Sequence, residues 1–189
     1  METESAIQAE KRALRAEQRR KLGLLPPERR AEHSRSLLSC LRLHPQGAPL
    51  IAFVPLASEP DVLPLLRERW AAGTPVVLPR VAEDGLVLHR VSAEAELVPG
   101  AWGILEPPAR APRWDGGVAD CLVPGLAFDA GGFRLGRGKA YYDRLLGQLG
   151  QDVCTTGVFF ALQEVERVPR EAHDRRLHAV VTERGFREF

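Results

Sequence analysis

The residues most able to do chemistry lie in one segment, DAGGFRLGRGKAYYDRLL. Three cations, Arg134, Arg137 and Lys139, gather there among glycines, with no acid between them and Asp143. Glycines let backbone amides approach a phosphate closely, and a following helix N-terminus adds its dipole. Like charges in one loop repel unless an anion holds them, so the segment predicts polyphosphate binding. A flexible basic turn before a core helix is the alternative.

The loop is not a P-loop. A Walker A motif needs a glycine five positions before its Gly-Lys pair, and then Ser or Thr to hold magnesium. Phe133 occupies that glycine position before Gly138, and Ala140 follows the lysine. Phosphate binding here must therefore use another loop geometry.

Asp143 follows the loop in the first turn of the expected helix. It could cap the helix dipole, which is the common role of such an acid. It could also hold Mg²⁺ beside phosphates, because that ion favours one or two carboxylates plus phosphate oxygens. The cationic loop beside Asp143 favours its role as a metal ligand.

Near the N-terminus, Lys11 and Arg15 have i, i+4 spacing, which places both cations on one helix face. By itself this spacing favours a solvated basic face.

The elements that must position these residues alternate between helices and apolar strands. Arginine- and alanine-rich residues 4–22 and the amphipathic segment 27–43 predict two N-terminal helices. The rest predicts strands over 49–56, 75–81, 85–91, 120–128, 153–160 and 178–182, and helices over 61–73 and 139–150, with a proline-rich surface excursion at 92–118. This rhythm predicts a parallel sheet with helices packed outside it, an α/β fold.

The composition excludes several classes of protein. The chain has 189 residues, enough for one domain over residues 1–189 with a sizeable core. Its formal net charge of +1 argues against a nucleic-acid binder driven by bulk charge. Its 3 cysteines are scattered, so they form neither a disulfide framework nor a zinc motif, and we expect them to pack in the core.

No segment resembles a signal peptide, an organellar transit peptide or a membrane helix. We therefore expect a cytoplasmic protein that binds no membrane and no nucleic acid. Only Lys11, Lys21 and Lys139 are lysines among the 26 basic residues. Two of the three thus fall at the candidate phosphate contacts.

The chemistry-bearing segments together resemble a known family. VPGLAFD, GFRLGRGKAYYDRLL, SEPDVLPLL, VVLPRV, WGILEP and HDRRLHAVVTE occur in the order seen in 5-formyltetrahydrofolate cyclo-ligases, also called 5,10-methenyltetrahydrofolate synthetases. The resemblance runs from about Lys11 to Glu183, and RLGRGKAYYD is its most specific part. It implies a three-layer α/β/α fold with a mainly parallel open sheet like that of NagB, RpiA and the CoA-transferases, with the N-terminal helices packed on the sheet.

The resemblance also implies a reaction. Such enzymes use ATP and Mg²⁺ to cyclise 5-formyltetrahydrofolate to 5,10-methenyltetrahydrofolate, releasing ADP and phosphate, through a phosphorylated formyl intermediate. Phosphoryl transfer needs mainly positioning and charge neutralisation, which arginines, a lysine and backbone amides supply. We expect a monomer whose partners are small molecules.

Site residues carry over by position. Arg137 and Lys139 are implied as catalytic phosphate contacts, and Asp143 and Asp174 as magnesium ligands. ATP contacts are implied at Lys11, Arg15, Arg134, Leu135, Gly136, Arg137, Gly138, Lys139, Ala140, Tyr141 and Tyr142. Folate contacts are implied at Val54, Glu59, Trp102 and Tyr142.

Several of these folate contacts have structural alternatives. Glu59 could orient an amino-pyrimidine ring or act as an acid at a helix N-terminus. Val54 could be core, and Trp102 could merely anchor its loop rather than stack on a pterin. Phe128 could be either core or pocket wall.

The chain departs from the family at two positions. Ala140 stands where the family usually has glycine, and we expect it in the first turn of the helix, where alanine is harmless. His178 stands where the family commonly has aspartate, and we expect an altered local hydrogen bond there. His173, beside Asp174, is the histidine of most interest.

Two other functions fit parts of the sequence. One is a diverged paralogue that keeps the ATP loop and takes another substrate. The other is a non-catalytic nucleotide- or RNA-binding module, which would need exposed aromatics among its basic residues, and only 6% of residues are aromatic. We also predict that Lys139→Ala and Asp143→Ala lower activity far more than stability.

Overall fold

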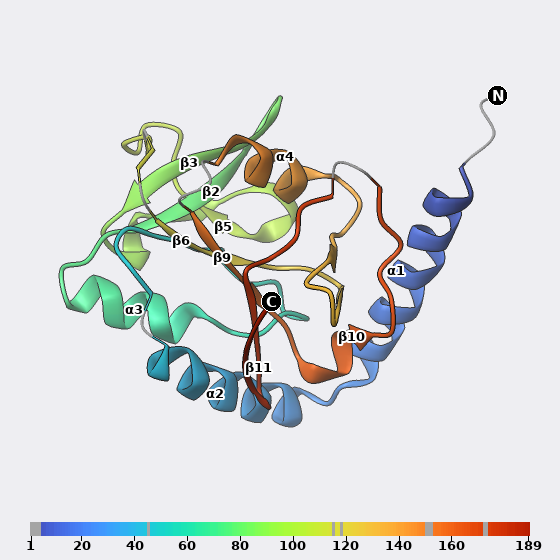
Figure 1. Ribbon diagram of the computed structural model, residues 1–189. Helices are drawn as coiled ribbons and strands as arrows, with labels where there is room; N and C mark the ends of the chain where they lie inside the picture. Colours follow the sequence, from blue (N-terminus) through green and yellow to red (C-terminus); the bar gives the residue numbers. More distant parts are fainter. Residues whose placement is uncertain (1–4, 45, 115, 118, 150–152, 172–173) are drawn as a thin grey trace.

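A computed structural model describes residues 5–44, 46–114, 116–117, 119–149, 153–171 and 174–189 of the chain (Figure 1). Its centre is a seven-stranded sheet in the order β12-β11-β9-β6-β1-β2-β3. The strands are β1 (Leu50–Ile51), β2 (Val76–Ala82), β3 (Gly85–Val91), β6 (Asp120–Val123), β9 (Cys154–Val158), β11 (Ala179–Thr182) and β12 (Gly185–Glu188). The five inner strands run parallel, and β3 and β12 pair antiparallel at the edges. The α/β expectation is confirmed.

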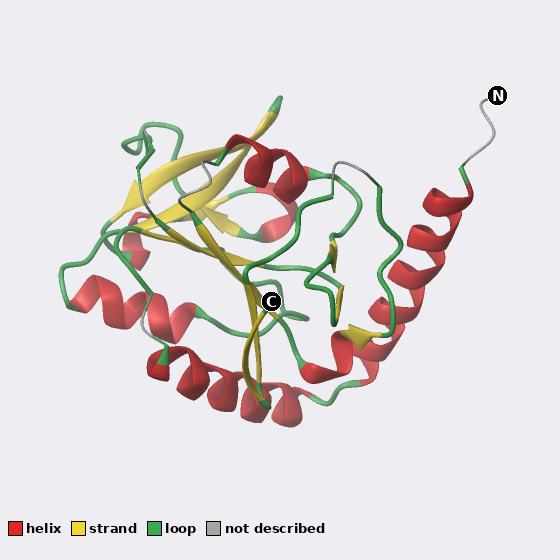
Figure 2. Ribbon diagram, in the orientation of Figure 1, coloured by secondary structure: helices red, strands yellow, loops and turns green. Residues whose placement is uncertain are grey.

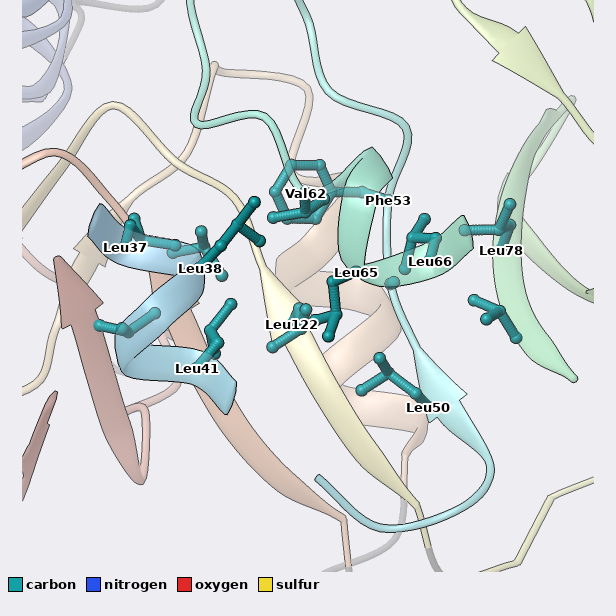
Figure 3. Close-up of a cluster of buried hydrophobic side chains, with 14 of the residues drawn as sticks. Leu37, Leu38, Leu41, Leu50, Phe53, Val62, Leu65, Leu66, Leu78 and Leu122 are labelled. Carbon is teal, nitrogen blue, oxygen red and sulfur yellow. The ribbon is translucent and has the colours of Figure 1, made fainter. Parts of the chain in front are cut away.

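Helices cover both faces of this sheet. Helices α2 (Pro27–Leu43) and α3 (Leu63–Ala71) lie on one face and α4 (Tyr141–Gln148) lies on the other (Figure 2). Side chains alternate between the two faces of a strand, so Leu50 packs with the leucines of α2 and α3, while Ile51 packs with those of α4. Figure 3 shows the first cluster, in which Leu37, Leu38, Leu41, Leu65 and Leu66 meet Leu50, Leu78 and Leu122.

Helix α1 (Ala6–Leu24) departs from the expectation that both N-terminal helices pack on the central sheet. It packs instead beside a small sheet of β10 (Glu164–Val165), β7 (Ala127–Asp129) and β8 (Arg134–Leu135) (Figure 1). Its thin apolar stripe explains this, since Leu14 meets Ala127 and Leu135, and Leu22 meets Phe160. This placement brings the basic face of α1 to the strand β8 that begins the glycine-rich loop.

The proline-rich excursion at 92–118 has more structure than expected. It contains the short helices η1 (Glu94–Glu96) and η2 (Ala101–Gly103) and a hairpin of β4 (Val98–Pro99) and β5 (Leu105–Glu106). A further short helix, η3 (Ala161–Gln163), follows β9. The β4–β5 hairpin contacts β2 and so forms a wall over the central sheet.

His178 lies directly before β11 and makes local hydrogen bonds there. Its Nδ1 lies 3.0 Å from the Thr155 backbone nitrogen, which donates to it, and its own backbone nitrogen donates to the Thr155 carbonyl oxygen. These bonds tie the beginning of β11 to the beginning of β9. His178 therefore lies at the amino ends of the strands.

The cysteines pack as expected at two of three positions. Cys121 is buried in the core, where burial raises the pKa of its thiol to about 12, and Cys40 packs against the cluster under α2. Cys154 is exposed at the beginning of β9, so the expectation of packing is wrong there. Among the described residues, no helix combines the length and the apolar character needed to cross a membrane.

Candidate active site

A cavity of about 330 Å³ opens at the carboxyl ends of the central strands. It is lined by Phe53 and Val54 from the segment after β1, and by Pro124 and Gly125, which directly follow β6. The glycine-rich loop closes one side, and the β4–β5 hairpin closes another. Open α/β sheets bind their ligands in this region, because the strand ends leave a crevice there.

Arg134 is the most deeply buried cation of the cavity. Its side chain is 1% exposed, and Nη2 donates to Asp143 Oδ1 at 2.8 Å. Its Nε and Nη1 have no hydrogen-bond partner among the described residues. Buried polar groups are normally hydrogen-bonded, so an arginine beside the cavity with two unused donors is a candidate contact for an anionic ligand.

Arg137 and Glu59 lie together at the same wall. Arg137 Nε donates to Glu59 Oε1 at 2.9 Å, and Arg137 Nη2 donates to Ser58 Oγ at 3.2 Å. The other carboxylate oxygen of Glu59 accepts from the Leu56 backbone nitrogen at 2.9 Å. Helix α3 begins at Leu63, beyond Glu59, so Glu59 is not the N-terminal acid of a helix.

Two cations of α1 contact the segments around the cavity: Arg15 contacts the glycine-rich loop, and Lys11 contacts the segment before β11. Arg15 Nε donates to the Gly136 carbonyl oxygen at 3.0 Å, and its guanidinium lies beside Gly138. Lys11 is buried, and its Nζ lies 2.6 Å from Asp174 Oδ2 and 3.0 Å from Glu171 Oε2. The pair is therefore not a solvated basic face.

Burial lowers the pKa of Lys11, but the hydrogen bonds to Asp174 and Glu171 and the negative charges of these acids together outweigh burial and leave that pKa raised. The ammonium is thus charged in the folded protein. Burial and the charge of Arg19 lower the pKa of Arg15, while the charges of Asp143, Asp174 and Glu171 oppose that shift. Arg15 therefore lies within electrostatic range of both predicted metal ligands.

The two predicted metal ligands each hold a cation in this structure, Asp143 with Arg134 and Asp174 with Lys11. The described residues contain no group of three or more metal-ligating side chains. Two carboxylates suit Mg²⁺ when phosphate oxygens and water complete its shell, so the donor set fits that ion. His173 lies outside the described residues.

The predicted folate contacts and Phe128, the possible pocket wall, divide into three groups. Val54, Glu59 and Tyr142 line the cavity, as does the neighbouring Tyr141. Burial raises the pKa of the Tyr142 hydroxyl well above its usual value, with nearby Cys121 and Glu59 adding to the shift, so it stays a neutral donor. The side chain of Trp102 lies outside the described residues. Phe128 is fully buried in the core beneath α4, so it is not a pocket wall.

Ala140 does not lie in the first turn of α4, and that expectation is wrong. It is the residue before the helix and has left-handed backbone angles, φ 53° and ψ 19°. The loop must reverse sharply between Gly138 and Tyr141, which forces this conformation. An L-residue pays about 1–2 kcal/mol for it.

We expect Ala140→Gly to raise the free energy of unfolding by about 1 kcal/mol, because glycine adopts left-handed angles without that strain. Urea denaturation followed by circular dichroism measures the change. Ala130→Gly is the matched control. Ala130 is also exposed, in the turn between β7 and β8, and does not have a positive φ, so this variant should lose stability. An Ala140→Gly variant that is less stable than the parent would contradict the strain.

Sequence reasoning missed two acids of the site. Glu106 lines the cavity from β5. The only signal for it in the sequence was that it belongs to WGILEP, one of the segments that resemble the family. Glu171 binds both Lys11 and Gln8, with Gln8 Nε2 donating to Glu171 Oε2 at 2.7 Å. Its position three residues before Asp174 was the available signal.

Comparison with known proteins gives a consistent result. The sequence model of the 5-formyltetrahydrofolate cyclo-ligase family matches residues 7–183. The 5-formyltetrahydrofolate cyclo-ligase of Mycolicibacterium smegmatis is 33% identical over 170 residues, covering 84% of this chain and 85% of that protein. The mouse (Mus musculus) enzyme of the same name is 28% identical over 193 residues, covering 94% and 95%.

A solved structure shares the fold. The NMR structure of 5,10-methenyltetrahydrofolate synthetase from Aquifex aeolicus superposes with a TM-score of 0.83 at 35% sequence identity. The match covers 94% of this chain and 92% of that one. The residues that the family model matches, 7–183, include the cavity-forming strands and the glycine-rich loop.

Proposed function

Because the chain belongs to the 5-formyltetrahydrofolate cyclo-ligase family, we propose that it converts 5-formyltetrahydrofolate to 5,10-methenyltetrahydrofolate with ATP and Mg²⁺. The observation that carries the proposal is Arg134, buried at the cavity wall with two unused N–H donors. Arg137 and Lys139 line the same cavity. Three cations around one opening suit a polyphosphate.

The reaction needs an activated formyl group. The N5-formamide is a poor electrophile, because its nitrogen donates electron density into the carbonyl. In the proposed first step the formyl oxygen attacks the γ-phosphorus of ATP, and the bond from that phosphorus to ADP breaks. N10 then attacks the formyl carbon and loses its proton, and the carbon–oxygen bond breaks to release phosphate. These steps close a five-membered ring, in which the former formyl carbon is the methenyl bridge between N5 and N10.

In the proposed reaction, separate groups of residues bind the phosphates, the rest of ATP and the metal. Arg137 and Lys139 contact the transferred phosphoryl group, where fixed cations stabilise developing charge. Lys11, Arg15 and the loop from Arg134 to Tyr142 hold the rest of ATP. Asp143 and Asp174 would hold Mg²⁺, which when bound neutralises phosphate charge.

Val54, Glu59, Trp102 and Tyr142 contact the folate. A folate seated against the strand ends brings N10 close to the activated carbon, which supplies the proximity contribution to the rate.

Three ion pairs keep the charges of the free site balanced: Arg134–Asp143, Arg137–Glu59 and Lys11–Asp174. In each, a cation proposed for ATP holds an acid proposed for another ligand. Burying an unpaired charge is costly. Binding of the substrates and the metal would therefore exchange partners within the site, with each charge still compensated.

The proposal extends to the whole chain. Residues 1–189 act as one cyclo-ligase domain and function as a monomer. The mainly parallel sheet between two helical layers supports the finer assignment to the NagB, RpiA and CoA-transferase-like folds.

A spectrophotometric assay tests the proposed function. Purified protein with 5-formyltetrahydrofolate, ATP and Mg²⁺ at mildly acidic to neutral pH should build the near-ultraviolet absorbance of the methenyl product. Omitting ATP should abolish that absorbance. No absorbance from a protein that still binds ATP would contradict the proposal and favour a paralogue with another substrate.

A further inference from the structure

Glu106 is a carboxylate at the wall of the cavity with no role in the function proposed above. The residue is 5% exposed, and it lies in β5 of the β4–β5 hairpin, whereas Glu59 lies in the loop that follows β1. Val81, Leu86 and Ile104, which also line the cavity, are apolar. A buried acid in such surroundings is costly unless donors surround it.

The hairpin fixes the position of this carboxylate. Glu106 Oε1 accepts from the Ala101 backbone nitrogen at 2.8 Å. Gly100 lies directly against the side chain, and a Cβ there would come within 2.3 Å of the carboxyl carbon of Glu106. Glycine at 100 therefore leaves the space that the carboxylate occupies.

The second oxygen of Glu106 is incompletely satisfied. Oε2 lies 3.5 Å from Arg80 Nη1, which is too long for a good hydrogen bond. Arg80 Nη1 instead donates to the Pro107 carbonyl oxygen at 2.9 Å. Within the described part of the chain, Oε2 accepts no hydrogen bond. Arg80 thus compensates the charge of Glu106 but leaves an acceptor for a ligand.

Glu59 is less available for that purpose. Its Oε1 accepts from Arg137 and its Oε2 accepts from the Leu56 backbone nitrogen. Glu59 also belongs to the phosphate side of the cavity, through Arg137. The formyl group on N5 must react at that side, and the amino-pyrimidine edge of a pterin points to the opposite end of the ring from N5 and N10.

We propose that Glu106 binds the amino-pyrimidine edge of the folate and so acts as a specificity-determining residue. The 2-amino group and the adjacent ring N–H present two donors side by side, which match one carboxylate, and such charge-assisted pairs are the stronger hydrogen bonds. The inference rests on the proposed function. It assigns to Glu106 the ring-orienting role that the sequence suggested for Glu59.

Binding measurements without turnover test the proposal. Isothermal titration calorimetry with 5-formyltetrahydrofolate should show at least a tenfold higher Kd for Glu106→Gln than for the parent protein. The Kd of a non-hydrolysable ATP analogue should change less than twofold, because Glu106 lies away from the phosphate loop. Glu83→Gln, which alters an exposed acid in the β2–β3 turn, is the matched control and should leave both Kd values unchanged.

A ligand lacking the 2-amino group separates recognition from structural support of the hairpin. The parent protein should bind 2-desamino-5-formyltetrahydrofolate at least tenfold more weakly than 5-formyltetrahydrofolate, whereas Glu106→Gln should bind the two within about twofold. An equal loss in both proteins would overturn the assignment, because another group would then recognise the amino edge.

The comparison of the two ligands on the parent protein needs no variant, so it can overturn the proposal even if Glu106→Gln fails to fold. A parent protein that binds both ligands equally would overturn the proposal. A parent protein that binds 5-formyltetrahydrofolate but does not cyclise it would instead contradict the proposed function alone. The two failures are thus distinguishable.

Discussion

Lys139→Ala is expected to lower kcat/KM at least about 100-fold while leaving Tm unchanged. Lys139 is exposed at the mouth of the cavity and makes no hydrogen bond or ion pair with the described residues. Removing the Lys139 side chain should therefore leave the stability of the fold unchanged. In the proposed reaction it is a fixed cation at the transferred phosphoryl group, and losing one such group typically costs about 100- to 1,000-fold in rate. The methenyl absorbance assay and a thermal melt measure the two quantities.

The chain supplies its own control for this variant. Lys21 also lies on the surface, where it pairs with Glu17 one helical turn away in α1. Lys21→Ala should keep both kcat/KM and Tm, because an exposed pair of this kind contributes little. A Lys139→Ala protein with activity within threefold of the parent would show that Lys139 does not contact the phosphoryl group. A large drop in Tm would instead favour a structural basic turn.

Local patterns in the sequence predicted the elements well where turn chemistry marks their ends. The expected strand 85–91 is β3, because Asp84-Gly85 makes the turn before it. The expected helix 27–43 is α2, because Pro26 precedes the helix and Pro27 is its first residue. The strand predicted at 49–56 was too long. Only Leu50–Ile51 pair as β1, since the apolar residues that follow line the cavity instead of joining the sheet.

The site was predicted as a set of residues but not as a set of contacts. Periodicity and glycine spacing locate a cationic loop, and the resemblance locates the acids. Neither shows that Arg137 pairs with Glu59 or Lys11 with Asp174, because these partners are far apart in the chain and meet only through the sheet topology. Glu106 was missed for the same reason, since only the β4–β5 hairpin carries it to the cavity.

The pairing of Asp143 with Arg134 alters a prediction made from the sequence. The sequence predicts that Asp143→Ala lowers activity far more than stability. In the structure, however, the Arg134 side chain is 1% exposed and Asp143 is its one hydrogen-bond partner within the described part of the chain. Removing one member of a buried pair leaves an uncompensated charge, at a cost of about 3–5 kcal/mol.

Asp143→Ala is therefore expected to lower the free energy of unfolding by about 3 kcal/mol, near the low end of that range because Asp143 itself is 20% exposed. Urea denaturation measures the change. Arg134→Met should lower the free energy of unfolding by less than Asp143→Ala does, because water can solvate the remaining carboxylate and methionine fills the space of the arginine stem.

The double variant Arg134→Met with Asp143→Ala separates stability from catalysis. It should recover most of the stability lost by Asp143→Ala, since an apolar replacement of a buried pair is often neutral. It should recover none of the activity, because the site then lacks both a phosphate contact and a metal ligand. If Asp143→Ala alone lowered the free energy of unfolding by less than about 1 kcal/mol, Arg134 would have another partner in the folded protein. Its two unused donors would then no longer support an anion site.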